Sequence, residues 1–203
     1  MATSVVGCPA GRVNLCIEQG ATFVQTISWS DKATGVPVDI STASLRMQIR
    51  DTVESATVLI ELSTGNGRII KLPTVVPAAA VASFDTTTQV TVSGATFVTD
   101  GVRVGQSAVI AGSTSNDGTF TIAAVISETE LALDTTLTVE PAAGTLEVQD
   151  LGRFSLNIAA TDTSALDFGT NNQAVYDLEC EFATLEVRRI MQGYAFLDLE
   201  VTR

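Results

Sequence analysis

The chain has 203 residues, enough for two small domains or one large β-domain, and carries a net charge of −12 at pH 7 without a single histidine. The lack of histidine excludes Ser-His-Asp and Cys-His catalytic sites and histidine-ligated metal sites, and the scarcity of clustered Lys and Arg disfavours nucleic acid and membranes as partners. Hydrophobic residues make up 45% of the chain and aromatic residues 5%, and the abundance of Thr, Val and Gly predicts an all-β fold.

Residues 1–11 lack a basic start followed by an apolar stretch, so we expect no secretory signal and synthesis in the cytoplasm. We assign these residues to an N-terminal arm. No apolar run reaches about 18 residues, so no transmembrane helix is predicted. A first strand is predicted over 12–18, with Cys16 on the face opposite Leu15 and Ile17.

The next segments alternate between apolar and polar residues, as half-buried strands do. Residues 21–29 place Phe23, Ile27 and Trp29 on one face, which predicts a core position for Trp29, with an interface anchor as the alternative. Further strands are predicted over 45–50 and 58–62. Gly and Asn at 64–67 predict a hairpin turn before an extended piece at 68–72.

The segment 73–150 has a composition of its own. It contains nine acids and one base, Arg103, for a net charge of −8 that leaves −4 for the rest, and it has no Lys, Cys, Met, Trp or Tyr. Pro73, Pro77 and an Ala-rich run at 78–82 form the start of this segment. We therefore predict a small β-barrel or β-sandwich inserted into the first domain, with short strands at 89–93, 102–104, 108–111, 119–126, 130–133 and 145–148.

The first domain resumes with a predicted strand at 154–158 and one helical turn at 159–166, capped by Thr161 or Asp162. Residues 176–182 alternate cleanly, with Tyr176, Leu178, Cys180 and Phe182 on the inner face. The last strand is predicted over 187–201, with Gly193 as a bulge. The predicted organisation is an arm at 1–11, a discontinuous sandwich at 12–72 plus 151–203, and an insertion at 73–150.

Two groups of acidic residues are candidates for a catalytic or calcium site. Glu179 and Glu181 lie two residues apart on one strand, roughly 7 Å, which is within the spacing of glycosidase carboxylates. A solvated outer face is the favoured interpretation, because a catalytic acid needs burial. Residues 116–118 are too short for a calcium loop and predict a turn. No catalytic residue, cofactor or metal ligand is therefore predicted.

The three cysteines and one basic pair remain as candidate functional residues. Cys180 is predicted to lie in the core. Cys8 and Cys16 are either free thiols or a candidate disulfide, within the arm or between subunits, formed in an oxidising medium. Arg188 and Arg189 are either an ordinary surface pair or a docking contact for an acidic partner.

The strands outside 73–150 resemble small immunoglobulin-like proteins of tailed bacteriophages, which occur in baseplate, collar and fibre-attachment components. The residues that carry the resemblance are 18–29, 37–40, 45–50, 154–158, 161–163, 176–179, Gly193 and 200–203. Residues 96–105 and 115–122 look like another β-module that recurs in phage virion proteins. The insertion and the cysteine-bearing arm depart from the simplest members of the family.

The resemblance implies an immunoglobulin-like β-sandwich in a non-enzymatic virion component, assembling in several copies at the neck, collar or tail. Other virion proteins and further copies of the chain would be its partners, through strand edges, loops, the arm and the candidate interface residues Trp29, Arg188 and Arg189. Two alternatives stay open. One is a capsid decoration protein, and the other is a receptor- or glycan-binding module, which would need exposed aromatics and offers only Phe84, Phe97 and Phe120 in the insertion.

Overall fold

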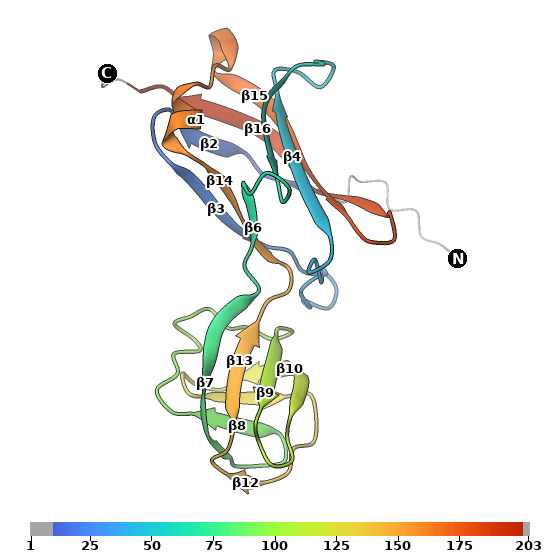
Figure 1. Cartoon of the computed structure of the whole chain (residues 1–203), viewed down its shortest axis with the longest axis vertical. Helices are drawn as coiled ribbons and strands as arrows, with labels where there is room; N and C mark the ends of the chain where they lie inside the picture. The colour runs from blue at the N-terminus through green and yellow to red at the C-terminus, as the bar shows by residue number, and fades with distance from the viewer. Residues whose placement is uncertain (1–9, 201–203) are drawn as a thin grey trace. The chain divides into compact units, whose positions relative to one another are not determined.

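The computed structural model describes residues 10–200 and confirms the all-β class, with 50% strand and 4% helix (Figure 1). The chain divides into two compact units. The first comprises residues 10–27, 42–71 and 154–200, and the second comprises Ser28–Ser41 and Leu72–Arg153. Residues 28–41 thus belong to the second unit, whereas the sequence pattern had placed them in the first.

The first unit is a sandwich of two sheets (Figure 1). A six-stranded sheet has the order β1-β16-β15-β4-β5 with β2 also paired to β16, and a three-stranded sheet has the order β3-β14-β6. The strands are β1 Gly11–Arg12, β2 Leu15–Glu18, β3 Phe23–Ser28, β4 Ser44–Arg50, β5 Val58–Ser63, β6 Ile69–Lys71, β14 Arg153–Ile158, β15 Gln173–Glu181 and β16 Val187–Asp198.

The N-terminal strand runs parallel to the last strand and is interrupted once. β1 pairs with β16 through Gly11 and Met191, and β2 resumes in the same register through Leu15 and Ala195. In the gap, the carbonyl of Val13 crosses Gly193 so closely that any Cβ on residue 193 would collide with it. The Tyr176 hydroxyl donates a hydrogen bond to the same carbonyl at 2.6 Å. Val13 is thus fixed from two sides.

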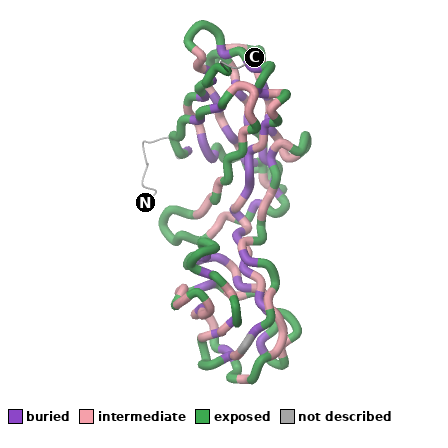
Figure 2. The backbone as a smooth tube through the Cα atoms, turned by 90° about the vertical axis from the view of Figure 1, so that its left-hand side faces the viewer, coloured by how far each residue is buried: buried purple, intermediate pink, exposed green. Residues whose placement is uncertain are grey.

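The sandwich core forms mainly from apolar side chains at alternate strand positions, and Figure 2 shows buried residues interspersed with less buried ones along the tube. Cys180 lies in this core with no exposed surface, so the prediction for it is confirmed. The other core residues include Leu15, Ile17, Leu45, Met47, Ile49, Leu62, Phe154, Leu156, Ile158, Leu178, Ala195 and Leu197.

Three local predictions for this unit need correction. The bulge in β16 is at Ile190, because Leu178 pairs with Met191 and the next residue of β15 pairs with Arg189. The turn at 64–67 does not close a hairpin, because β5 and β6 belong to different sheets. The short helix α1 (Ala160–Ser164) has Ala159 as its N-cap without a side-chain hydrogen bond, so neither predicted cap residue serves.

The second unit is a closed six-stranded barrel (Figure 1). The strand order is β7-β13-β9-β10-β11-β8, and the pairing of β7 with β8 closes the ring, with β12 attached to β7. The bounds are β7 Thr74–Phe84, β8 Gln89–Val92, β9 Ser107–Ala111, β10 Gly118–Val125, β11 Glu130–Leu133, β12 Glu140–Pro141 and β13 Thr145–Gln149.

Small aliphatic side chains fill the barrel, as expected from the low aromatic content. Its buried cluster contains only two phenylalanines, Phe84 and Phe97, among Val, Ile, Leu and Ala. The sequence pattern missed the long strand β7, because the Pro and Ala-rich stretch was interpreted only as the boundary of the insertion, and it predicted a strand at 102–104 where the structure has none. Pro77 fits within β7 because the register with β13 shifts at this point.

Residues 28–41 are bound to the second unit by hydrogen bonds with Leu151 and Gly152, which follow the last barrel strand β13. The Trp29 amide donates to the Gly152 carbonyl, and the Val38 amide donates to the Trp29 carbonyl, both at 2.9 Å. Trp29 therefore lies beyond the end of β3 and is half-buried, as Phe23 and Ile27 of β3 also are. The prediction for Trp29 fails because these backbone hydrogen bonds draw the chain away from β3.

We predict that Gly193→Ala lowers the free energy of unfolding of the first unit by about 1–3 kcal/mol, because the new Cβ would overlap the Val13 carbonyl. Urea denaturation can be followed through the two tyrosines of the chain, Tyr176 and Tyr194, which both lie in this unit. The matched control is Gly65→Ala, where the nearest atom to the new Cβ is 3.7 Å away, and we expect a change within about 0.5 kcal/mol. Equal effects of the two substitutions would contradict the close contact between residue 193 and the Val13 carbonyl.

Candidate interaction surfaces

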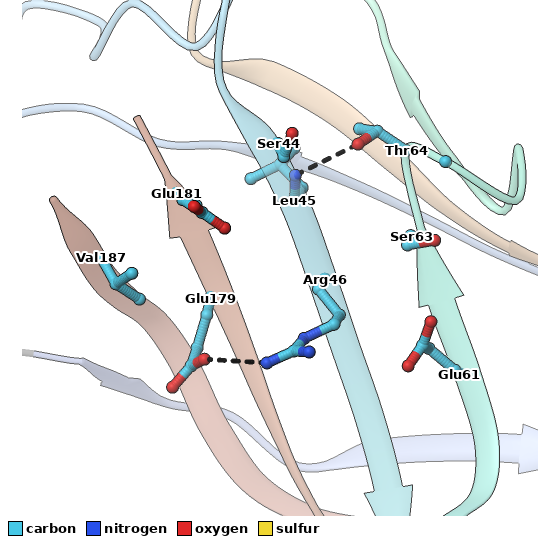
Figure 3. Close-up of a pocket in the computed structure, with 10 residues that line it drawn as sticks. Ser44, Leu45, Arg46, Glu61, Ser63, Thr64, Glu179, Glu181 and Val187 are labelled. Carbon is cyan, nitrogen blue, oxygen red and sulfur yellow. Dashed lines mark hydrogen bonds and ion pairs between the residues drawn. The ribbon is translucent and has the colours of Figure 1, made fainter. Parts of the chain in front are cut away.

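The outer face of the six-stranded sheet carries a hollow of about 320 Å³ between β4, β5, β15 and the start of β16. Figure 3 shows Arg46 in the middle, with Glu179 on one side and Glu61 on the other. Glu181 lies farther along β15. The paired carboxylates considered from the sequence are therefore on the outer face of a strand, with a third glutamate nearby.

Ion pairs dominate the electrostatics of this face. Glu179 is 3.8 Å from Arg46 and 3.3 Å from Arg189, and Arg189 also lies 3.2 Å from Asp177. Gln48 donates a hydrogen bond of 2.7 Å to Glu61. A carboxyl group that acts as a general acid typically sits in an apolar pocket, whereas these glutamates lie among cations on a face open to solvent.

Arg188 and Arg189 each have an acidic neighbour. The Arg188 Nε donates to Glu186 at 2.7 Å, and this hydrogen bond holds the pKa of Glu186 below its usual value. The Arg188 guanidinium also lies over the Phe182 ring, 5.2 Å from its centroid. Arg189 pairs with Asp177 and Glu179 as described above. The two arginines therefore form part of a mixed-charge surface, which weakens the case for a basic docking site.

The described cysteines have opposite environments. Cys16 is exposed on β2 and Cys180 is buried in the core, and both are free thiols within residues 10–200. Burial raises the pKa of Cys180 to about 11. Cys8, the other member of the candidate disulfide, lies outside the described residues.

A second hollow, of about 460 Å³, lies between β2 and β3 and was not predicted. We call it the β2–β3 groove. None of its lining residues is charged; they are Val13, Asn14, Leu15, Cys16, Phe23, Gln25, Thr26, Ile27 and Met191. The only signal in the sequence was the partly apolar inner face of β3. That signal could not be interpreted without knowing that β2 and β3 are edge strands of different sheets.

The barrel offers little aromatic surface. Phe84 and Phe97 are 1% and 0% exposed, and Phe120 packs against the same core. The two buried rings cannot stack on a sugar, so within 73–150 only the partly buried Phe120 is left for such a contact.

One buried carboxylate in the second unit has a structural explanation. Asp150 has a side chain only 1% exposed and pairs with Arg103 at 2.6 Å. It also accepts hydrogen bonds from the Gln106 side chain and the Gly152 amide. Since these donors satisfy both of its oxygens, Asp150 holds the last barrel strand and the exit segment in place.

A search of residues 10–200 finds no group of three or more His, Cys, Asp or Glu side chains arranged to hold a metal ion. The short helices in this range are also too brief and too polar to span a membrane. Comparison of the sequence with models of known families and with curated proteins gives no match.

We predict that Cys16 reacts with a disulfide reagent such as Ellman's reagent far faster than Cys180. With a pKa of about 11, Cys180 is thiolate to only about one part in a thousand at pH 8, and it is also buried. In a Cys8→Ser variant of the native protein, one thiol should react quickly and the second only after unfolding. The Cys8→Ser, Cys16→Ser double variant is the control, and fast reaction of that variant would contradict the buried position of Cys180.

The raised pKa of Cys180 also makes the stability of the fold depend on pH. The folded protein binds the Cys180 proton more tightly than the unfolded chain, whose thiol has a pKa of about 8.5. This contribution to the free energy of unfolding is therefore complete below about pH 8.5 and is lost as the pH rises towards about 11.

Proposed function

We propose that this protein is a non-enzymatic structural component of a tailed-phage virion, present in several copies at the neck, collar or tail. The resemblance of the strands outside 73–150 to phage proteins carries the proposal, and the strand order of the sandwich supports it. Counting β1 and β2 as one strand, the second, fifth and sixth strands in chain order form one sheet, and the third, fourth, seventh and eighth lie together in the other. This division of strands is similar to that of immunoglobulin-like sandwiches and supports the resemblance.

Several of the residues that carry the family resemblance lie on strands of this sandwich, whereas residues 28–29 and 37–40 belong to the second unit and 201–203 lie outside the described residues. Residues 45–50 lie in β4, 154–158 in β14 and 176–179 in β15, and their apolar members are buried in the core. Gly193 lies against the Val13 carbonyl, where no Cβ would fit. One departure from the standard order is that the first strand lies beside the last. Because a shared fold does not establish a shared function, the virion role rests on the resemblance.

Assembly is the function that these surfaces support best. The barrel closes on itself through β7 and β8, whereas the sandwich has strands at sheet edges, including β2, β3 and β5. Edge strands present unpaired backbone groups that a neighbouring chain can extend by β-augmentation. In a symmetric structure, many such contacts of modest strength add up to a stable assembly. We therefore propose that the sandwich makes the principal contacts.

Immunogold labelling of intact particles tests the proposed function. Antibodies raised against the purified protein would be applied to phage particles from the bacterial strain whose genome encodes the chain. We expect label at the neck, collar or tail. Label distributed over the whole capsid would support the decoration alternative, and particles without label or without the protein by mass spectrometry would contradict a virion role.

A further inference from the structure

We propose that the β2–β3 groove binds residues 1–9 of a second copy of this chain, so that each subunit donates one segment and receives another. This inference rests on the proposed function, because it specifies the contact through which the copies would assemble. The argument uses the groove, the chemistry of residues 1–9 and the way in which the chain enters β1.

The groove lies where the two sheets of the sandwich separate. β2 pairs with β16 and β3 pairs with β14, and neither strand pairs with another described strand on its groove side. Phe23 and Ile27 of β3 are only partly buried, and Val13 is 45% exposed. An extended segment placed here can pair its backbone with an edge strand and cover these side chains.

The lining of the groove selects an uncharged occupant. The hollow on the outer sheet face contains Arg46 and three glutamates, and the other hollows of the sandwich contain Asp51, Arg12, or Arg68 with Asp162. The β2–β3 groove contains no charged residue. Burying a charge without a partner is costly, so an acidic or basic peptide is a poor fit.

Residues 1–9 have the matching chemistry. Their sequence, Met-Ala-Thr-Ser-Val-Val-Gly-Cys-Pro, contains no charged side chain in a chain of net charge −12. Val5 and Val6 are β-branched residues that favour extended backbone. Nine extended residues reach roughly 30 Å.

The same segment of the same chain does not reach the groove easily. Gly11 and Arg12 are already paired with β16, so residues 5 and 6 would have to fold back immediately before them. Residues 5 and 6 of a second copy can enter the groove without such a reversal of the chain.

The exchange joins different patches of the surface, so it is a head-to-tail contact. Contacts of this kind close into rings when the rotation between subunits allows it. In a ring each groove is filled by the neighbouring chain. Cys8 follows Val6 by two residues, roughly 7 Å, and Cys16 lines the groove, so the exchange brings Cys8 of one copy close to Cys16 of the next.

Thiol cross-linking of the full-length protein with diamide, a thiol oxidant, tests the exchange. For wild type we expect a ladder of covalent multimers on a non-reducing gel. Cys8→Ser alone and Cys16→Ser alone should give none. A mixture of these two variants should give a dimer and nothing larger, because each pair then has one Cys8 and one Cys16.

Two further variants separate groove binding from accidental collision. Val6→Asp places a charge in the donated segment outside the described fold, and we expect the cross-linked fraction to fall about tenfold or more. Ile27→Asp should have the same effect from the groove side, with Val24→Asp as the matched control, because Val24 is 59% exposed on the same strand. Circular dichroism would verify that the aspartate variants are folded.

Several results would overturn the proposal. A monomeric product with an internal Cys8–Cys16 bond would show that the segment binds its own chain. Cross-linking that persists in Cys8→Ser alone, in Cys16→Ser alone or in Val6→Asp would show non-specific contact. Absence of any cross-link in wild type at the highest soluble concentration would also refute the exchange. If the particles were still labelled by the antibody, the virion role would stand and only this contact would fail.

Discussion

The sandwich depends on the point where the N-terminal strand passes the last strand of its sheet. Because residue 193 has no side chain, the Val13 carbonyl can lie against it, and β1 and β2 can remain in one parallel register on either side. The Tyr176 hydroxyl binds the same carbonyl from β15. This arrangement fixes the edge of the six-stranded sheet and one wall of the β2–β3 groove.

The position of the insertion explains how the first unit tolerates a barrel of more than seventy residues. The chain leaves the sandwich after Lys71 and returns at Phe154, and these two residues are direct partners in the pairing of β6 with β14. The two ends of the insertion therefore start from adjacent points. A barrel inserted between two paired neighbours can leave the strand pairing at that point intact, and residues 28–41 join the second unit separately, between β3 and β4.

Strands with a clear inner and outer face were predictable from the sequence. The alternation in β4 and β15 and the turn-bounded strand β11 appear in the structure close to where the pattern placed them. Local patterns also placed Cys16 outside and Cys180 inside. These features depend on the side-chain period of a single strand, which the sequence carries directly.

Features that depend on pairing between distant strands were not predictable in the same way. β7 contains Pro77 and an Ala run, and only its partners β13 and β8 make it a barrel strand. The sequence predicts a bulge at Gly193, but the bulge is at Ile190. Residue 193 has to be glycine because the Val13 carbonyl lies against it. Trp29 follows the parity of β3, yet hydrogen bonds with Gly152 and Val38 place it in the second unit. The groove depends on which strands are left at the sheet edges, and no single segment contains that information.

Amide hydrogen exchange of β2 is the most direct test of the N-terminal strand as an integral part of the sandwich. The Val13 and Gln19 amides on either side of β2 donate to Gln192 and Asp198, so in the parallel register the amides of Leu15 and Ile17 also face β16. These two amide hydrogens should exchange nearly as slowly as those in the centre of β15. The exposed turn at 31–35 provides the fast reference within the same molecule. Exchange of the Leu15 and Ile17 amides as fast as that of the turn would show that this strand is not held by the sandwich, and the groove and its proposed exchange would lose their basis.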